Sequence, residues 1–256
     1  MIRLSKRLEM IANQVPEGSR LADIGSDHAL LPTYLAQKGR IAKGIAGEVN
    51  PGPYQAASRQ IREARLTDTI DVRLGNGLEV ISAGEVDVIT IAGMGGALIA
   101  SILEAGKEKL PGVSRLVLQP NVGEAMVRQW LLDHQWVLSE EMILEEDGKI
   151  YEILTAVPSG LASTSNDEIY RDQTLAGEMP VQRDWLLKMG PYLLQDPTPV
   201  WFAKWDLEYG KLEMIRGQLA LSEQPEAKQK QREIEEEMKT IREVLACLQK
   251  DKASSN

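Results

Sequence analysis

Short β-rich runs alternate with helical stretches over residues 1–157 of this 256-residue chain. Such alternation is typical of a parallel sheet covered by helices on both faces. Strands are predicted over residues 20–24, 43–49, 70–74, 86–92, 115–119, 136–145 and 150–157. Helices are predicted over residues 4–14, 30–37, 53–64, 97–106 and 124–134. The sequence therefore predicts an α/β domain.

A change of composition follows Val157, where residues 158–166 are rich in Ser, Pro, Gly and Asn. Such a segment is typical of a loop between domains. We therefore place one domain over residues 1–160 and a helical domain over residues 161–256. Beyond Asp167 we expect no strand.

The C-terminal segment predicts a helical hairpin. A short helix over residues 180–196, broken at Gly190-Pro191, precedes long helices over residues 199–222 and 226–251. Apolar residues recur in each long helix at the spacing of a heptad seam. The first seam comprises Trp205, Leu212, Ile215 and Leu219, and the second comprises Ile234, Met238, Ile241, Leu245 and Leu248. Two seams joined by a proline turn indicate an antiparallel coiled coil.

Composition excludes several classes of protein. Cys247 is the only cysteine, so the chain forms no internal disulfide and no cysteine zinc site. No apolar run approaches the ~18–20 residues that a membrane span needs, and the N-terminus lacks the apolar core of a signal peptide. We therefore expect a cytoplasmic protein that binds neither membrane nor metal.

The net charge of −9 is unevenly distributed along the chain. Residues 1–66 carry a net charge of +4, and the remainder carries −13. Local potential steers partners more than total charge does, so the N-terminal third is compatible with a basic face that binds nucleic acid. Scattered, solvated charges would give the same counts.

The segment Leu21-Ala-Asp23-Ile-Gly25-Ser-Asp27-His28-Ala29 ends the first predicted strand. A glycine there lets the backbone turn tightly and approach a ligand above the strand tip. Dinucleotide-binding domains use G-x-G-x-x-G at this point, where the helix N-terminus receives a pyrophosphate. This chain lacks the second and third glycines, and Asp23 and Asp27 would repel a pyrophosphate. Acidic side chains suit the ammonium group of S-adenosylmethionine instead.

Other predicted strand ends strengthen this interpretation. Glu48 ends the second strand, where a carboxylate accepts hydrogen bonds from both ribose hydroxyls of a nucleoside. Residues 75–78 follow the third strand and would hold the adenine ring, with Asn76 or a backbone amide at its edge. Residues 91–96 follow the fourth strand and contain three glycines that free the backbone to line a transfer site. These loops converge on one edge of the sheet. Alternatively, Asp27 caps a helix and Glu48 is a surface residue.

The chain resembles the bacterial TrmK family in five motifs, namely D-I-G-S-D-H-A, A-G-E-V, I-A-G-M-G-G, L-Q-P-N and a later G-K-I-Y-E-I. Members of this family are tRNA methyltransferases that modify N1 of adenine 22 with S-adenosylmethionine. The resemblance covers the whole chain and implies a class I Rossmann-like methyltransferase fold with a C-terminal antiparallel coiled-coil hairpin. It also implies tRNA as the partner. Asn76 departs from the aspartate expected in its loop, which bears on affinity for the cofactor.

The resemblance assigns site residues by motif. Those expected to bind the cofactor are Asp23, Gly25, Ser26, Asp27, His28, Glu48, Val49, Asn76, Gly77, Leu78, Ala92, Gly93, Met94, Gly95 and Gln119. Gln119, Pro120 and Asn121 are expected to face the target base. The expected catalytic residues are Asp27, Asn121 and Tyr151.

The chemistry of methyl transfer to adenine N1 also indicates what the site has to do, independently of the family resemblance. Adenine N1 has an in-plane lone pair, so the enzyme has to align it with the methyl group, exclude water and accommodate positive charge on the base. Asp27 is the first candidate for stabilising that charge. His28 is a second candidate as a hydrogen-bonding group, although it equally suits a helix start, and Tyr151 equally suits a half-buried strand position.

Binding of the tRNA has two candidate surfaces. One is a set of basic residues that would contact phosphates, namely Arg3, Lys6, Arg7, Arg59, Arg62 and Arg65. The other is the C-terminal hairpin, whose alternative role is dimerisation, although we expect a monomer. Other functions remain open, namely methylation of another RNA or of a small molecule, or RNA binding without catalysis.

Overall fold

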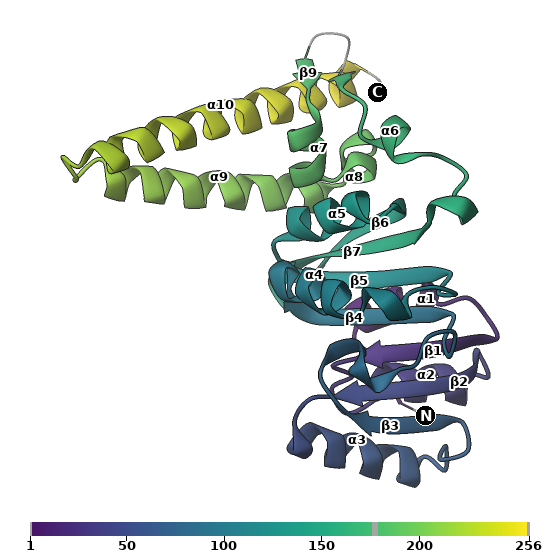
Figure 1. Cartoon of the computed structure of the whole chain (residues 1–256). Coiled ribbons are helices and arrows are strands. Elements are labelled where there is room, and N and C mark those ends of the chain that lie inside the picture. Colours follow the sequence, from purple (N-terminus) through teal and green to yellow (C-terminus); the bar gives the residue numbers. More distant parts are fainter. Residues whose placement is uncertain (1, 176–178, 255–256) are drawn as a thin grey trace. The chain divides into compact units, whose positions relative to one another are not determined.

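The computed structural model of the chain describes residues 2–175 and 179–254. The chain divides into two compact units, Met1–Ile169 and Tyr170–Asn256 (Figure 1). The first unit holds a seven-stranded sheet, and the second holds the long helices. The division lies slightly beyond residue 160, where the loop-like composition had suggested it.

The sheet of the first unit has the strand order β3-β2-β1-β4-β5-β7-β6. Its strands are β1 (Ser19–Ile24), β2 (Ile41–Glu48), β3 (Ile70–Leu74), β4 (Val88–Gly95), β5 (Arg115–Val122), β6 (Trp136–Glu146) and β7 (Lys149–Pro158). The strands from β1 to β5 pair in parallel. The sheet is therefore parallel as predicted, except that β7 runs antiparallel to β5 and to β6.

The direction of β7 follows from the short turn that precedes it. Asp147 and Gly148 both have positive φ, 51° and 71°. Two successive residues of this kind form the hairpin turn that best matches strand twist, and a hairpin of two residues leaves no room for a crossover helix. The late strands are thus a β-hairpin at one edge of an otherwise parallel sheet.

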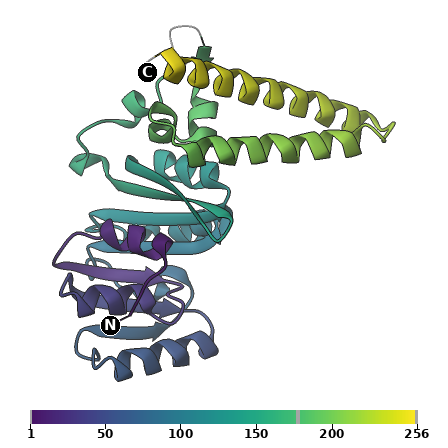
Figure 2. The ribbon, with the colours of Figure 1, turned by 180° about the vertical axis from the view of Figure 1, so that it is seen from behind.

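Helices cover both faces of this sheet. They are α1 (Lys6–Asn13), α2 (Leu30–Gln37), α3 (Pro51–Glu63), α4 (Gly96–Ala105), α5 (Glu124–Asp133) and α6 (Asn166–Ile169), with 3₁₀ turns η1 (Gly77–Val80), η2 (Lys107–Lys109) and η3 (Ser159–Leu161). Helices α1 and α2 lie on the face seen in Figure 2, and α4 and α5 lie on the opposite face seen in Figure 1. The predicted α/β domain is confirmed.

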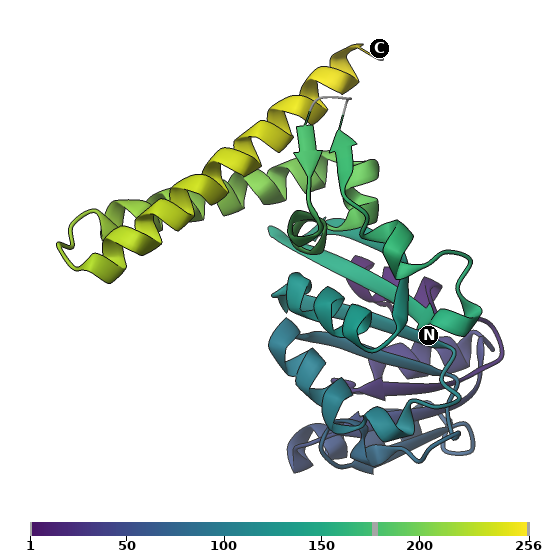
Figure 3. The same ribbon diagram turned by 45° about the horizontal axis from the view of Figure 1, so that its top comes forward.

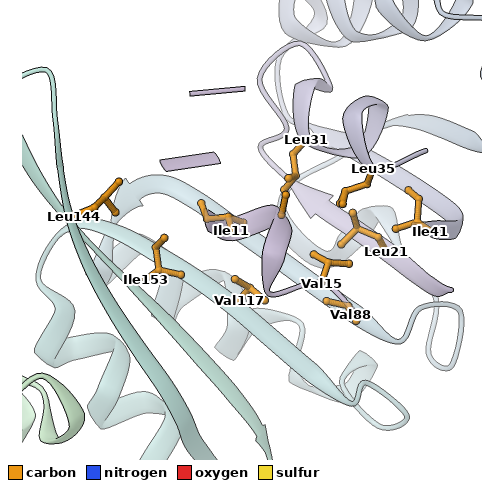
Figure 4. Close-up of a cluster of buried hydrophobic side chains, with 11 residues drawn as sticks. Ile11, Val15, Leu21, Leu31, Leu35, Ile41, Val88, Val117, Leu144 and Ile153 are labelled. Atoms are coloured by element: carbon orange, nitrogen blue, oxygen red, sulfur yellow. The ribbon is translucent and has the colours of Figure 1, made fainter. Parts of the chain in front are cut away.

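One buried cluster fixes α1 and α2 to the sheet. Ile11 of α1 and Leu35 of α2 pack with Val88 and Val117, which come from the two central strands β4 and β5 (Figure 4). Each of these four side chains is fully buried. At about 25 cal/mol per Å² of apolar surface removed from water, such burial is the main force holding the layers together. It also holds the start of α1 near the ends of β4 and β5.

The second unit contains the two long helices α9 (Pro199–Leu219) and α10 (Pro225–Ser254), which pack together. Figure 3 shows them beside the small hairpin of β8 (Gln173–Leu175) and β9 (Met179–Val181). Two short helices precede them, α7 (Arg183–Met189) and α8 (Pro191–Gln195). At about 1.5 Å per residue, α9 is ~30 Å long and α10 is ~45 Å long. The predicted helical hairpin is present.

Two details of this unit differ from the sequence prediction. The strands β8 and β9 lie where no strand was expected, because three-residue strands are too short to show an alternating pattern. The seam predicted on α10 is buried at all five positions. On α9, however, Ile215 is 43% exposed, while Trp205 is buried. The coiled-coil description of the hairpin therefore stays a prediction.

The described residues contain neither a membrane-spanning helix nor a cluster of metal-binding side chains. Across residues 2–175 and 179–254, no helix combines the length and the apolar character needed to cross a bilayer. Within the same ranges, no group of three or more His, Cys, Asp or Glu side chains is arranged to hold a metal ion.

Candidate active site

A cavity of about 360 Å³ opens at the carboxyl ends of β1 and β4. In open α/β sheets, ligands bind at this edge. Nine of the lining residues are ones that the sequence had assigned to the site: Asp23, Gly25, Ser26, Asp27, Ala92, Gly93, Met94, Asn121 and Tyr151. The fold therefore brings together side chains from loops that lie far apart in the sequence.

The loop after β1 has a strained backbone. Gly25 has a φ of +69°, and Asp27, His28 and Ala29 then adopt positive φ values of 38°, 64° and 54°. A run of three such residues other than glycine is rare, and backbone strain of this kind concentrates at functional sites. The loop presents Asp27, whose side chain is 88% exposed, at the rim of the cavity.

Asp23 lies beneath this loop and is buried. Its carboxylate accepts hydrogen bonds from Ser26 Oγ at 2.5 Å and from Thr90 Oγ1 at 2.6 Å. Burial raises the pKa of Asp23, and the two hydroxyl donors oppose that rise. Asp23 and Ser26 thus form the polar floor of the cavity below Gly25.

Glu48 ends β2 and is also buried. It accepts a hydrogen bond from the backbone N–H of Asp27, and burial raises its pKa. Its Oε1 atom has no hydrogen-bond partner within residues 2–175 and 179–254. A buried carboxylate oxygen without a donor is costly. This oxygen therefore suits the hydroxyl donors of a bound ribose, as the sequence had suggested.

The end of β4 is shaped by a bulge at Gly93. Its φ is +77°, and the pairing with β5 skips it, from Ala92–Gln119 to Met94–Pro120. This frees the Gly93 backbone: its N–H donates to Gln119 Oε1 at 3.1 Å, and its carbonyl accepts from Asn121 Nδ2 at 2.8 Å. The glycines of this segment thus connect β4 to the polar residues at the end of β5.

Arg7, Gln119 and Asn121 form a continuous hydrogen-bonded row, which we call the polar chain. Arg7 Nη1 donates to Gln119 Oε1 at 2.5 Å, and Gln119 Nε2 donates to Asn121 Oδ1 at 3.1 Å. The Arg7 guanidinium also lies over the ring of Tyr151, 5.2 Å from its centroid. Gln119 is fully buried and does not line the cavity, whereas Arg7, Asn121 and Tyr151 do.

Several residues predicted for the site lie outside the lining of this cavity. Asn76, Gly77 and Leu78 line a separate hollow beside α4, and the backbone N–H of Asn76 is held by the Glu79 carboxylate at 3.0 Å. Val49, which directly follows Glu48, has an exposed side chain. The other predicted site residues that do not line this cavity are His28, Glu48, Gly95 and Gln119. Their contacts with a cofactor stay predictions.

Two residues that the sequence did not place in the cavity also line it: Arg7, predicted only as a phosphate-binding residue, and Leu8, for which no role was predicted. A signal was present in the sequence. Arg7 lies three residues after Leu4 and four before Ile11, so it falls on the apolar face of its helix. A charged residue on that face indicates a partner inside the molecule.

A comparison with known families decides what kind of protein carries this cavity. The model of the TrmK family, described as tRNA (adenine(22)-N(1))-methyltransferase, matches residues 21–243. The chain belongs to the TrmK family. The predicted family and the class I Rossmann-like methyltransferase fold are confirmed.

Relatives match over nearly the whole length. The tRNA (adenine(22)-N(1))-methyltransferase of Bacillus subtilis (strain 168) is 43% identical over 245 residues, covering 95% of this chain and 98% of that protein. The crystal structure of B. subtilis TrmK has a TM-score of 0.85 at 42% identity, with 96% of this chain and all of that chain covered. A Streptococcus pneumoniae protein in complex with S-adenosyl-L-methionine has a TM-score of 0.78 at 40% identity, with 95% and 100% covered.

Proposed function

We propose that this chain transfers a methyl group from S-adenosylmethionine to N1 of adenine 22 in bacterial tRNA. The observation that carries the proposal is family membership over residues 21–243, joined to a cavity lined by the family's motif residues at the carboxyl ends of β1 and β4. Because the whole length of the B. subtilis relative is matched, the substrate assignment extends to both units.

The residues around the cavity fit the cofactor chemically. The unpartnered Glu48 Oε1 suits the ribose hydroxyls, and the carboxylates of Asp23 and Asp27 suit the ammonium group of the methionine moiety. Left-handed Gly25 lets the backbone pass close to that moiety. When bound, S-adenosylmethionine supplies an electrophilic methyl group on a sulfonium centre. We assign the adenine ring to the loop of residues 75–78, although those residues do not line the cavity.

The protein's part in the reaction is to hold adenine in line with the methyl group. Adenine N1 attacks with its in-plane lone pair, so no base is needed to activate it. Positive charge then develops on the base, and the exposed Asp27 carboxylate at the cavity rim stabilises it. Asn121 and Tyr151 orient the base, the first by hydrogen bonding and the second by its ring.

The N1 atom lies on the Watson–Crick edge, so the target adenine has to leave its pairing or stacking partners to enter the cavity. We assign the grip on the tRNA backbone to exposed basic residues. Three of them lie on α3 or directly after it, namely Arg59, Arg62 and Arg65. Their side chains are exposed and form no ion pair with any residue in the described ranges. Arg3 and Lys6 are also exposed. The hairpin of α9 and α10 offers a second contact surface.

We propose that the enzyme acts as a monomer. None of its steps calls for a metal ion or a membrane. Since tRNA is a cytoplasmic molecule, we assign the enzyme to the cytoplasm.

The test is methyl transfer with a mapped product. The full chain is incubated with S-adenosylmethionine labelled on the methyl group and with unmodified tRNA transcripts, and the label is located by nuclease digestion and mass spectrometry. The expected product is N1-methyladenine at position 22, absent from a matched transcript carrying guanine there. Label at another position, or none despite cofactor binding, would overturn the substrate assignment.

A further inference from the structure

The polar chain has a direction that Arg7 and the Gly93 backbone impose together. A guanidinium has five N–H donors and no acceptor, whereas a carboxamide has a donor end and an acceptor end. Arg7 Nη1 and the Gly93 backbone N–H both meet the same Gln119 atom, at 2.5 Å and 3.1 Å. Two donors facing one atom require that atom to be the oxygen. The orientation of the Gln119 amide is thereby fixed.

That orientation passes on to Asn121. With its oxygen toward Arg7, Gln119 directs Nε2 to the Pro120 carbonyl at 2.8 Å and to Asn121 Oδ1 at 3.1 Å, which uses both of its N–H groups. Asn121 Oδ1 is therefore an acceptor at this contact, and Nδ2 turns to the Gly93 carbonyl at 2.8 Å. What remains for a ligand is one lone pair on Oδ1 and one N–H on Nδ2.

The direction of the Asn121 amide matters because of what adenine presents. The target edge carries an amino group that donates at N6 and a lone pair at N1 that has to stay free to attack. An Oδ1 lone pair accepts from the amino group and leaves N1 alone. A reversed amide would direct N–H groups at the base instead, and an N–H bonded to N1 occupies the attacking lone pair.

We infer that Arg7 is a positioning residue for methyl transfer, which acts with the Gly93 backbone to hold the Gln119 and Asn121 amides and so sets how the target adenine is held. The inference rests on the proposed function and deepens it. It differs from the phosphate-binding role that sequence alone suggested for Arg7. Arg7 is half-buried, lines the cavity and contacts Tyr151, whereas Arg3 and Lys6 on the same segment are exposed.

The test compares two conservative variants with wild type in the methyl-transfer assay. Arg7→Lys keeps the positive charge but loses the planar fork over Tyr151 and toward Gln119. Gln119→Glu keeps an acceptor for Arg7 but has no donor for Asn121. For both we expect kcat to fall about 10- to 100-fold, a size typical of a misplaced reacting group, while the KM for tRNA and the Kd for S-adenosylmethionine change by less than about threefold.

Controls separate this positioning role from a general effect of replacing an arginine and from an effect of Arg7 that does not act through Asn121. Arg20→Lys is the matched control, because Arg20 also donates to a side-chain oxygen of another segment, that of Asp87, but at the opposite end of β1; its kcat should equal that of wild type. In an Asn121→Ala background, Arg7→Lys should lower kcat little further, since coupled residues are not additive. Thermal melting of each variant shows whether it is folded, and Gln119→Glu tests the idea even if an Arg7 variant is unstable.

The contrary outcomes are distinct. If Arg7→Lys and Gln119→Glu keep the wild-type kcat, the inference is wrong. If Arg7 variants change only the KM for tRNA, and the salt dependence of KM becomes shallower, Arg7 binds phosphate and does not position Asn121. If wild-type enzyme methylates no tRNA, the proposed function itself fails, and the variants are not needed to show it.

Discussion

Two arginines organise polar networks in the first unit, and they do so in different ways. Arg128 of α5 has a fully buried side chain and bonds two buried carboxylates, Glu141 Oε1 at 2.6 Å and Glu152 Oε2 at 2.5 Å. Arg7 is half-buried and bonds a neutral amide, with a second amide beyond it at the cavity. The first network ties α5 to the β6–β7 hairpin, and the second lies at the sheet edge where we propose that the ligands bind.

The difference shows what each network is suited to do. A fully buried ion cluster is rigid, because breaking it leaves a charge without water or a partner. A chain of amides carries no net charge beyond its arginine, so its far end can exchange hydrogen bonds with a ligand at little cost. We therefore expect substitutions at Arg128 to act on folding and substitutions around the cavity to act on ligand binding and rate.

The largest expected effect is on stability. Arg128→Met leaves Glu141 and Glu152 buried without their cation, which should lower the free energy of unfolding by about 3–5 kcal/mol. Urea unfolding followed by circular dichroism measures it. Arg7→Lys, in the half-buried network at the cavity, should change the free energy of unfolding by less than about 1 kcal/mol. Equal losses at both sites would remove the distinction between the networks.

Next in size is the effect of Asp27→Ala on the reaction. Because we propose that Asp27 stabilises charge on the base, we expect kcat to fall at least ~100-fold, as with other charge-stabilising groups. Its side chain is 88% exposed, so the melting temperature should stay near that of wild type. Steady-state kinetics and calorimetry check the two quantities. A wild-type kcat in this variant would remove Asp27 from the mechanism.

Glu48→Gln should act on cofactor binding. Losing charge-assisted hydrogen bonds to the ribose is worth about 1.5–3 kcal/mol, or roughly 10- to 100-fold in the Kd for S-adenosylmethionine. Isothermal titration calorimetry measures this Kd. Glu48→Gln should not destabilise the free protein at neutral pH, because it replaces a buried carboxylate that lacks a partner on Oε1. An unchanged Kd would place the ribose elsewhere.

The raised pKa of Glu48 gives that site a pH dependence. In the free protein burial favours the protonated carboxyl, while hydroxyl donors of the ribose favour the ionised form. Binding should therefore release a proton in the pH range just above the ordinary glutamate value of 4.5, and affinity should rise with pH through that range. Calorimetry in buffers of different ionisation enthalpy detects the proton, and Glu48→Gln should abolish its release.

The folded free protein holds this proton more tightly than the unfolded chain does, so stability should fall as pH rises through the same range.

The smallest expected effect concerns the tRNA surface. Replacing Arg59, Arg62 and Arg65 together with Gln should raise the KM for tRNA severalfold at physiological salt and leave kcat unchanged. Each phosphate contact that is lost should reduce the slope of log affinity against log salt by about 1. Filter binding over a salt series checks the slope. A slope equal to that of wild type would mean that α3 does not contact the tRNA.

Sequence reasoning predicted most of the fold because the first unit has strong local patterns. Residues 30–37 and 70–74 were predicted with the bounds that α2 and β3 have, since apolar periodicity and turn residues mark them. Strands β8 and β9 were missed because three residues carry no period. Ile215 was placed in a seam by spacing alone, although the facing helix leaves it exposed.

For the site, the motif residues were found and the network that joins them was not. Asp23, Gly25 and Asn121 belong to recognisable motifs, so their roles could be proposed from the sequence. The role of Arg7 depends on the bulge at Gly93 and on the packing of α1 against the sheet. Arg7 and Gln119 are 112 positions apart, and Gly93 and Gln119 are 26 apart, so no local pattern reports these contacts.

A crystal structure of the full chain with S-adenosylhomocysteine tests the proposed site most directly. We predict that the product lies in the cavity at the ends of β1 and β4, with a ribose hydroxyl on Glu48 Oε1 and its sulfur facing the side of Asp27 and Asn121. A product bound elsewhere, or Glu48 Oε1 left without a donor beside a bound ribose, would contradict this prediction.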